Sequence, residues 1–551
     1  MSRAYRLLRE SCFVVLMLLV ATATYAGESK SETKVVSGAT ESMVAMRDGV
    51  QLATNVFLPE GKGPWPVILT RTPYSKDGTF SFRWRQYNKK GYAFVIQDCR
   101  GTFRSQGKYR PFEDDRDDGY DTIGWIDKQP WCNGKIGLSG ASAMGITSLL
   151  AAISNPEHLV AAFVVVAPQS LWEEATFMGG VFKEADTTNW MRSRGALDQV
   201  AERKASLEDL DQQRALDILN NRDQIDIPIY FVGGWYDIFS TGTQGNFTYL
   251  QNHGRPGARG RQKLLMGPFG HGRLEGELRY KGGGGILNAL KDEIRWFDYH
   301  LKGTDNGIME EPAVTYYQMA AARRKHFSKK NGPRTAENWP VPSTATRLYL
   351  SGSHRLSKQA PSESHSSTSY RFDPNNPVPT VGGANLTLPL GPMDQRKIGE
   401  REDYLRYETP VLEQDVSIAG PVYVDLYVST DVPDTDFMVK LVDVYPDGYE
   451  ALLLDAPLRT RYREGREPGQ IKMMQPGKTV KLHIPIGGTA NTFEVGHKIA
   501  LHITSSNAPR FEVNRNTGEP IGVENKKPRV ATNTIHHDAD HPTALVLPVV
   551  D

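Results

Sequence analysis

The stretch Ile136-Gly-Leu-Ser-Gly-Ala-Ser-Ala-Met-Gly145 decides the fold. Its apolar beginning predicts a strand at 136–139, and the helical period of residues 143–154 predicts a helix directly after a run of small residues. A tight turn from strand to helix would expose the Ser142 hydroxyl at the carboxyl edge of a sheet, as in a nucleophile elbow. The common spacing Gly-x-Ser-x-Gly is not kept, because Met144 precedes Gly145. On this stretch alone, a serine that caps the helix is an equally good interpretation.

Short apolar runs of the same kind lie on both sides of this stretch. Helical-period segments lie between several of them, and buried strands that alternate with helices are typical of a parallel sheet covered on both faces. Residues 44–58 instead predict an antiparallel hairpin at one edge of the sheet. The predicted buried strands are 66–70, 92–97, 136–139, 161–166, 227–232 and 263–266, and the predicted helices are 118–128, 143–154 and 284–301.

With 551 residues, the chain is too long for one hydrophobic core. Residues 171–219 have the pattern of two or three amphipathic helices with no strand among them, which predicts a cap inserted between sheet strands. Beyond about residue 347, short alternating strands separated by turns predict an all-β jelly roll. We therefore expect an α/β-hydrolase core in two parts, 27–170 and 226–335, a helical cap at 171–225 and a C-terminal jelly-roll β-sandwich at 345–551.

Two further polar residues follow predicted strands in the order expected of an α/β hydrolase, Ser, then Asp, then His. Asp237 comes after the strand at 227–232, and His271 comes after the strand at 263–266. The carboxyl ends of parallel strands meet at one edge, so the three side chains can converge there. Taken singly, Asp237 could cap a helix and His271 could be an ordinary loop residue. The coincidence of all three positions favours a catalytic triad of Ser142, Asp237 and His271.

This set of side chains fits acyl transfer. A serine hydroxyl is hardly ionised at neutral pH, so it attacks a carbonyl only while a base such as His271 removes its proton. Asp237 would hold the imidazole tautomer and stabilise its cation. An oxyanion hole is also needed, and we expect its donors to be the backbone N–H of Ala143 and the phenol of Tyr74. From position alone, a packing role is the better interpretation of Tyr74, because a tyrosine in a loop usually packs.

A set of short motifs runs along nearly the whole chain. The motifs are Arg71-Thr-Pro-Tyr74, Gln97-Asp-Cys-Arg-Gly101 with Ser105-Gln-Gly107, Asp121-Thr-Ile-Gly-Trp125 with Gln129-Pro-Trp-Cys-Asn-Gly134, Gly140-Ala-Ser-Ala-Met-Gly145, Gly233-Gly-Trp-Tyr-Asp237, Gly267-Pro-Phe-Gly-His271, Arg295-Trp-Phe-Asp298 with Leu301-Lys-Gly303, and Gly420-Pro-Val422 with Phe437, Asp443, Pro446 and Gly448. They are similar, in order, to those of the cocaine esterase and X-Pro dipeptidyl-peptidase family of α/β-hydrolase serine hydrolases. The resemblance implies that Tyr74 supplies the oxyanion-hole hydroxyl and that the elbow follows Gly-x-Ser-x-x-Gly. For Asp98, Arg100 and Asp298, which lie in matching motifs, we expect a structural role as braces of loops at the sheet edge.

The aromatic residues of the cap, Trp172, Phe177, Phe182 and Trp190, predict an apolar acyl pocket, although packing between helices is a slightly better interpretation of them. The candidate substrate-binding residues are Trp172, Phe177, Trp190 and Trp235. The α-amino acid ester hydrolases of the family bind an ammonium group with carboxylates after the Gly-Trp turn, where this chain has Ile238-Phe239-Ser240. That difference argues against their branch, unless cap carboxylates of Glu173, Glu174 or Glu184 serve the same purpose.

The charge balance gives no reason to expect nucleic acid or an anionic membrane as partner. Lys and Arg number 65 and Asp and Glu number 64, for a net charge of +1. Residues 1–26 combine basic residues, an apolar run at 12–21 and a small-residue cleavage site, which predicts a cleaved signal peptide, a secreted or periplasmic protein and no stable membrane anchor. Homo-oligomerisation stays open.

The remaining chemistry-bearing residues predict neither a metal nor a cofactor. Cys99 and Cys132 lie near opposite ends of the predicted sheet and are expected to be free thiols. His536, His537 and His541 lack the spacing of a metal site. Three hypotheses follow: a serine hydrolase that cleaves an acyl ester or amide, an X-Pro dipeptidyl-peptidase, and a surface- or carbohydrate-binding protein that uses the jelly roll.

Overall fold

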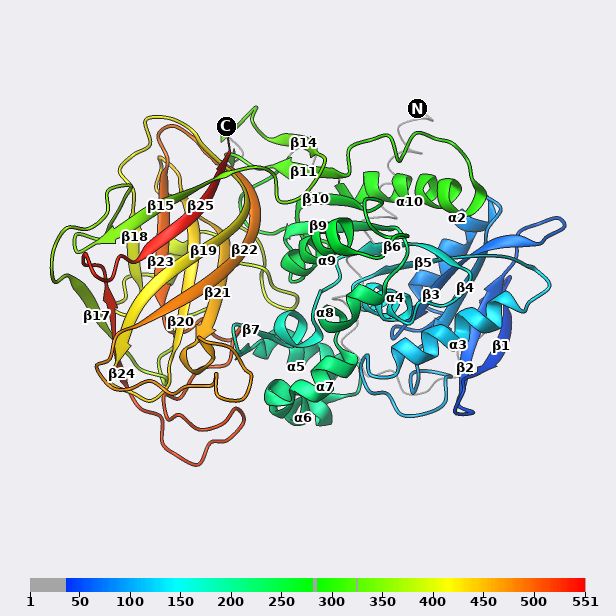
Figure 1. The fold of residues 1–551 in the computed structure, drawn as a ribbon, viewed down its shortest axis with the longest axis horizontal. Coiled ribbons are helices and arrows are strands. Elements are labelled where there is room, and N and C mark those ends of the chain that lie inside the picture. The colour runs from blue at the N-terminus through cyan, green and yellow to red at the C-terminus, as the bar shows by residue number, and fades with distance from the viewer. Residues whose placement is uncertain (1–35, 281–284, 324–325, 551) are drawn as a thin grey trace.

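The computed structural model describes residues 36–280, 285–323 and 326–550. Figure 1 shows an α/β unit with a helical cap on one side of the molecule and an all-β unit on the other. The predicted signal peptide at 1–26 lies outside the described residues. Within the described ranges, none of the helices combines the length and the apolar character needed to cross a bilayer.

The first unit is built on one ten-stranded sheet. The seven strands from β4 to β11 in the spatial order are parallel, and β1, β2 and β14 are antiparallel additions at the edges. The hairpin predicted at 44–58 is confirmed as β1 and β2. In spatial order the strands are β1 (Thr40–Ala45), β2 (Gln51–Phe57), β4 (Ala93–Asp98), β3 (Trp65–Thr72), β5 (Cys132–Ala141), β6 (Leu159–Val165), β9 (Ile229–Tyr236), β10 (Lys263–Gly270), β11 (Val314–Gln318) and β14 (Gly332–Ala336).

Helices cover both faces of this sheet. Successive side chains of each strand point to opposite faces, so an apolar strand gives each face its own apolar layer for helices to cover. In β3, Val67 and Leu69 belong to the core cluster that includes α3 (Asp115–Asp127), α4 (Ala143–Ile153) and α9 (Ser240–His253). Ile68 belongs to the cluster on the other face, with α2 (Trp84–Asn88) and α10 (Gly285–Lys302). These two apolar layers hold the sheet rigid, and loops at its carboxyl edge are fixed as a result.

The cap lies between β6 and β9 and contains more than helices. Besides α5 (Glu184–Ser193), α6 (Val200–Ala205), α7 (Leu210–Leu216) and α8 (Ile218–Asn221), it carries a short hairpin of β7 (Phe177–Met178) and β8 (Val181–Phe182). The expectation of a strand-free cap was therefore wrong. The hairpin is held by tertiary contacts: a Cβ on Gly179 would lie 2.0 Å from the carbonyl oxygen of Pro457, in the all-β unit.

The C-terminal unit folds its strands around a second apolar core. Its pairings are antiparallel except for β16 with β18. Together with the first unit, this is the predicted class, an α/β-hydrolase domain with an inserted cap followed by an all-β domain. The strands are β15 (Thr344–Ser351), β16 (Arg355–Ser357), β17 (Ser367–Phe372), β18 (Leu405–Glu408), β19 (Val416–Thr430), β20 (Asp436–Val444), β21 (Glu450–Arg459), β22 (Val480–Phe493), β23 (Lys498–Thr504), β24 (Ala531–His536) and β25 (Ala544–Val550).

The cysteines are free, as expected, with Cys99 just beyond the carboxyl end of β4 and Cys132 at the start of β5. Across the part of the chain that the structure describes, no group of three or more His, Cys, Asp or Glu side chains could hold a metal ion. Among the histidines near the C-terminus, His536 ends β24 and His537 is buried.

Candidate active site

Three polar side chains stand at the carboxyl edge of the parallel sheet. Ser142, Asp237 and His271 are each the first residue after a strand, following β5, β9 and β10 respectively. The strands predicted from the sequence end a few residues earlier than the observed ones. The reason is that the Gly and aromatic residues at the ends of β9 and β10 are also typical of turns. The sheet therefore fixes all three backbone positions directly.

The three side chains form one hydrogen-bonded chain. His271 Nε2 lies 2.7 Å from Ser142 Oγ, and His271 Nδ1 lies 2.7 Å from Asp237 Oδ2. The second oxygen of Asp237 accepts a hydrogen bond from the backbone N–H of Phe239 at 2.7 Å. Asp237 and His271 are almost fully buried. This arrangement orients the imidazole so that one nitrogen faces the serine and the other faces a carboxylate.

The turn that carries Ser142 has the strained backbone of an elbow. Ser142 has φ 58° and ψ −125°, a conformation that is rare for any residue with a side chain. A Cβ on Gly140 would lie 2.1 Å from the carbonyl oxygen of Met144, and a Cβ on Gly145 would lie 3.1 Å from the Cβ of Ala167. The close approaches thus occur at 140 and 145, which explains why a methionine is tolerated at 144.

Tyr74 lies beside this serine. It follows β3 by two residues, and its phenol oxygen accepts a hydrogen bond from the indole N–H of Trp190 at 3.0 Å. Burial raises the pKa of the Tyr74 phenol, while hydrogen bonds to Trp190 and Ser142 and the charge of Arg194 lower it in part. The phenol is therefore protonated at neutral pH and within reach of the serine hydroxyl, where it can donate.

The loop that carries Tyr74 is braced from the end of β4. Asp98 Oδ1 accepts a hydrogen bond from the backbone N–H of Lys76 at 2.6 Å, and its other oxygen is buried without a hydrogen-bond partner. Burial raises the pKa of Asp98 to about 7. Arg100 pairs with Asp118 at 2.6 Å in the same region. These contacts agree with the bracing role predicted for Asp98 and Arg100.

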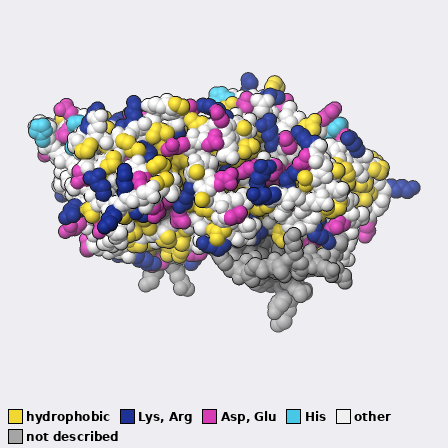
Figure 2. Space-filling model, turned by 90° about the horizontal axis from the view of Figure 1, so that it is seen from below, with side chains coloured by type: hydrophobic (Ala, Val, Ile, Leu, Met, Phe, Trp, Pro, Cys, Tyr) yellow, Lys and Arg dark blue, Asp and Glu magenta, His cyan; other side chains and the backbone are white. Residues whose placement is uncertain are grey.

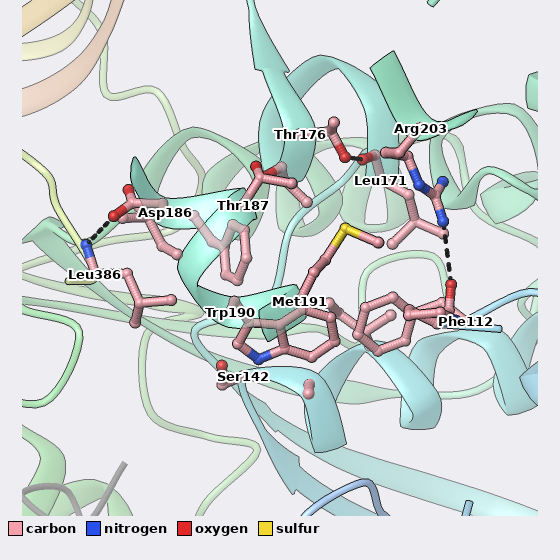
Figure 3. Close-up of a pocket in the computed structure, with 16 residues that line it drawn as sticks. Phe112, Ser142, Leu171, Thr176, Asp186, Thr187, Trp190, Met191, Arg203 and Leu386 are labelled. Carbon is pink, nitrogen blue, oxygen red and sulfur yellow. Dashed lines mark hydrogen bonds between the residues drawn. The ribbon is translucent and has the colours of Figure 1, made fainter. Parts of the chain in front are cut away.

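An apolar pocket opens at Ser142 and runs beneath the cap (Figure 3). Its cavity volume is about 70 Å³, which makes it a narrow site. The indole of Trp190 and the ring of Phe112 form one wall, with their centroids 5.4 Å apart and their planes within 17°. The lining residues are Pro111, Phe112, Ser142, Ala143, Ile146, Leu171, Ala175, Thr176, Asp186, Thr187, Trp190, Met191, Arg203, Ile238, Phe239 and Leu386.

Of the four aromatic residues predicted to bind substrate, only Trp190 lines this pocket. Trp172 is buried and donates its indole N–H to Ser206 Oγ at 2.9 Å. Phe177 is fully buried in the core, and Trp235 donates to the carbonyl oxygen of Tyr317 at 2.8 Å. The pocket role predicted for these three is therefore corrected to packing, because each is buried in the hydrophobic core and none lines the pocket.

The cap carboxylates considered for ammonium binding are all occupied elsewhere. Glu173 pairs with Arg466 and Glu184 pairs with Lys204, both away from the pocket lining. Glu174 is buried and accepts hydrogen bonds from the backbone N–H groups of Gly242 and Gln169, and burial raises its pKa to about 7. These contacts hold the cap onto α9 and leave no free carboxylate among the three.

Several pocket residues escaped the sequence interpretation. Phe239 lies in the segment after Asp237, which the sequence analysis uses only as a segment without carboxylates. Phe112 and Met191 come from a loop and from α5, and Leu386 comes from the C-terminal unit. No local pattern marks these residues, since they meet only when the cap and the all-β unit pack over the sheet edge.

Comparisons with known proteins agree with this architecture. Residues 48–222 match the family model described as X-Pro dipeptidyl-peptidase (S15 family). Residues 306–546 match the model of the X-Pro dipeptidyl-peptidase C-terminal non-catalytic domain. The first match contains the segment from the edge hairpin through Ser142 into the cap, and the second covers most of the all-β unit.

Individual relatives align over nearly the whole chain. It is 31% identical to a cocaine esterase from Rhodococcus sp. (strain MB1 Bresler), over 93% of this chain and 99% of that protein. An α-amino acid ester hydrolase structure superposes with a TM-score of 0.79 at 23% identity, covering 96% of this chain and 100% of that one. An aminopeptidase from a marine sediment archaeon, Thaumarchaeota archaeon, gives a TM-score of 0.79 at 24% identity, with 96% and 99% covered. At these identities the two structures show the shared fold.

Proposed function

The chain belongs to the cocaine esterase and X-Pro dipeptidyl-peptidase family of serine hydrolases, and from this premise we propose that it hydrolyses esters of bulky apolar acids. The observation that carries the proposal is the 2.7 Å contact between His271 Nε2 and Ser142 Oγ at the mouth of an apolar pocket. The surface-binding alternative gives no account of this arrangement.

In the proposed reaction, Ser142 Oγ attacks the carbonyl carbon of the ester while His271 Nε2 takes its proton. The carboxylate of Asp237, bonded to Nδ1, stabilises the imidazolium that forms. Both groups are almost fully buried, so water does not compete for their hydrogen bonds. The attack produces a tetrahedral intermediate whose former carbonyl oxygen carries the negative charge.

That oxyanion needs donors on the side of Ser142 opposite the histidine. The backbone N–H of Ala143, the first residue of α4, and the phenol O–H of Tyr74 are the donors we propose. Loss of one such donor typically costs about 3 to 4 kcal/mol of transition-state stabilisation. Collapse of the intermediate expels the alcohol, which receives the proton from His271, and leaves the acyl group on Ser142 Oγ. Water then attacks the acyl-enzyme by the same steps and regenerates the free serine.

The residues that line the pocket indicate which acyl group the site would bind. Phe112, Trp190 and Met191 lie on one side of Ser142, and Phe239 and Leu386 also border the space. Burying an aromatic or branched acyl chain there gains roughly 25 cal/mol for each Å² of apolar surface removed from water. A benzoate or branched-chain ester should therefore be a better substrate than an acetate ester.

The alternative is an X-Pro dipeptidyl-peptidase, and one lining residue favours it. Asp186 carries a carboxylate in the pocket wall, and a carboxylate at that position could pair with the ammonium group of a peptide N-terminus. Asp186 Oδ1 accepts hydrogen bonds from the backbone N–H groups of Leu386 and Thr387, at 2.9 Å and 3.1 Å, and Oδ2 is buried without a hydrogen-bond partner among the described residues. The rest of the lining is predominantly apolar, so we place the peptidase second.

Two measurements test the proposal. A fluorophosphonate probe should label the wild-type protein and fail to label Ser142→Ala. A panel of p-nitrophenyl esters beside Ala-Pro and Gly-Pro p-nitroanilides should show the benzoate ester with the highest kcat/KM. Labelling that persists in Ser142→Ala would remove Ser142 as nucleophile.

Asp186→Asn separates the two substrate classes. The asparagine keeps an oxygen that can accept from Leu386 and Thr387, so the pocket wall should be preserved, but it has no charge. If esters are the substrates, this variant should retain its ester activity. A selective loss of Pro-amide cleavage, in a protein that prefers those amides, would establish the peptidase reading instead.

We also propose that the chain is exported and loses its first 26 residues. The support is the basic start, the apolar run and the small residues before Gly27. N-terminal sequencing of protein recovered from the periplasm or medium should begin at or near Gly27. Recovery of the full-length chain from the cytoplasm alone would contradict this.

A further inference from the structure

Two residues at the end of the cap helix α5 contact Tyr74. Trp190 donates its indole N–H to the phenol oxygen at 3.0 Å. Four residues later, the guanidinium carbon of Arg194 lies 4.9 Å from the centre of the Tyr74 ring, and the same guanidinium donates to the carbonyl oxygen of Pro73 at 3.0 Å. The cap thus contacts the phenol oxygen, the ring and the backbone of this loop.

These contacts restrict where the phenol proton points. A phenol oxygen has one proton to donate and can accept hydrogen bonds on its lone pairs. Because the indole N–H occupies one acceptor position of Tyr74, the phenol proton is directed away from Trp190, and the Ser142 hydroxyl lies within hydrogen-bonding reach of the phenol. Accepting one hydrogen bond also polarises the phenol and strengthens the bond it donates. A guanidinium over the ring adds positive potential next to the same group.

The far side of α5 is anchored to the all-β unit. Asp186 accepts from the backbone of residues 386 and 387, and Asn189 Nδ2 donates to Thr387 Oγ1 at 3.2 Å. Phe112 stacks on Trp190 and limits rotation of the indole. The helix therefore spans from a fixed point on the C-terminal unit to the phenol at the sheet edge.

We infer that Trp190 and Arg194 are positioning residues for the oxyanion-hole tyrosine, so that the cap sets the strength of the Tyr74 hydrogen bond as well as forming a pocket wall. The inference rests on the proposed function, since it needs Tyr74 as an oxyanion donor. It makes the cap part of the catalytic geometry. Within this inference, the same cap helix forms a pocket wall and orients the tyrosine of the oxyanion hole.

A double-mutant cycle with Trp190→Phe and Tyr74→Phe tests the inference. Phenylalanine keeps an aromatic ring against Phe112, removes the N–H donor and makes the wall slightly smaller. With a p-nitrophenyl ester as substrate, Trp190→Phe should lower kcat about 10-fold and leave KM nearly unchanged, because the lost interaction strengthens in the transition state. In the Tyr74→Phe background the same change should have no further effect.

Trp172→Phe is the matched control. Trp172 also lies in the cap and donates its indole N–H, but to Ser206 and outside the pocket. Its substitution should leave kcat unchanged. A boronic acid that adds to Ser142 as a tetrahedral anion supplies a second readout, and its affinity should fall with kcat in Trp190→Phe while the affinity for the product acid stays constant. Arg194→Met should lower kcat by a smaller factor, about 3-fold.

The outcomes distinguish a failure of the proposed oxyanion hole from a failure of the positioning role of Trp190. If Tyr74→Phe leaves kcat unchanged, the proposed oxyanion hole is wrong and the inference falls with it. If Tyr74→Phe lowers kcat strongly but Trp190→Phe has the same effect in both backgrounds, or none in either, the inference is overturned and the proposed function stands. A loss of kcat in Trp172→Phe as large as in Trp190→Phe would show a general effect of cap stability and would also overturn it.

Discussion

The edge of the sheet and the pocket beneath the cap meet at Ser142 but are built in different ways. At the edge, three polar residues each follow a strand directly, and the sheet fixes their positions. The pocket is assembled from a loop at 111–112, the start of α4, the cap, the residues after Asp237 and Leu386 of the C-terminal unit. Parallel strands of one sheet position the reacting groups, whereas packing between distant segments forms the cavity.

This difference has a physical origin. Parallel strands bring their carboxyl ends to one line regardless of what surrounds them, so the reacting groups depend on few contacts. A pocket wall depends on how helices and loops pack, and each contact there changes with small shifts in volume. Chemistry should therefore be sensitive to the identity of single residues at the edge, and substrate preference to side-chain volume in the pocket.

The largest effect is expected from the edge. His271→Ala should lower kcat by roughly 10⁴- to 10⁶-fold, and Asp237→Asn by about 10⁴-fold, because the first removes the base and the second holds the wrong tautomer. Ester hydrolysis with an excess of enzyme measures both. The melting temperature should change little. Residual activity within 10-fold of wild type in either variant would show that these residues are not the base and its partner.

Phe177 in the core and Phe112 in the pocket allow an effect on stability to be compared with an effect on substrate preference. Phe177→Ala should cost about 3 to 5 kcal/mol of unfolding free energy, because its ring is fully buried in the core. It should leave the preference for bulky acyl groups intact. Phe112→Ala should instead lower kcat/KM for a benzoate ester about 10-fold relative to an acetate ester. Denaturant unfolding and the ester panel measure the two effects, and equal changes of preference would refute the separation.

One methyl group added at Gly140 should disrupt the turn that carries Ser142. Gly140→Ala places a Cβ where the carbonyl oxygen of Met144 lies 2.1 Å away, so the turn must shift and stability should fall by about 3 kcal/mol. Gly124→Ala is the matched control, since a Cβ there meets nothing within 4 Å in the interior of α3. That control should gain about 0.5 to 1 kcal/mol from helix propensity. A thermally stable and active Gly140→Ala would contradict the tight turn.

Asp98 is a polar residue at the end of a strand that we expect to act on stability rather than on chemistry. Its pKa is raised from 3.8 to about 7, so the folded state binds more protons than the unfolded state between pH 4 and 7. Stability from this group is therefore present at low pH and is lost as pH rises through that window, with a limiting slope of about 1.4 kcal/mol per pH unit.

Asp98→Asn keeps the oxygen that accepts from Lys76 and removes the titration. The variant should flatten the fall of unfolding free energy between pH 4 and 7 and should be more stable than the wild type at pH 8. Chemical unfolding at several pH values measures this. An unchanged pH dependence would mean that Asp98 is ionised throughout the range.

The sequence predicted most of what the edge contains. Ser142, Asp237 and His271 stand in the right order after apolar runs, and the motif around Tyr74 pointed to the oxyanion side. The pocket was predicted poorly, since Trp172, Phe177 and Trp235 turned out to face the core. An aromatic residue in an amphipathic segment is apolar on either side, and nothing in its neighbours along the chain says which side is filled by protein and which is left open.

The sequence by itself determined the order of strands and helices, the two units with their cap, and the three residues that follow β5, β9 and β10, because these follow from local periodicity and chain order. Only the tertiary structure decided that the close approaches of the elbow occur at Gly140 and Gly145, that Leu386 reaches the site across 244 positions from Ser142, and that Trp190 donates to Tyr74. Those features depend on distances of a few ångströms between segments far apart in the chain, and such distances are set by packing.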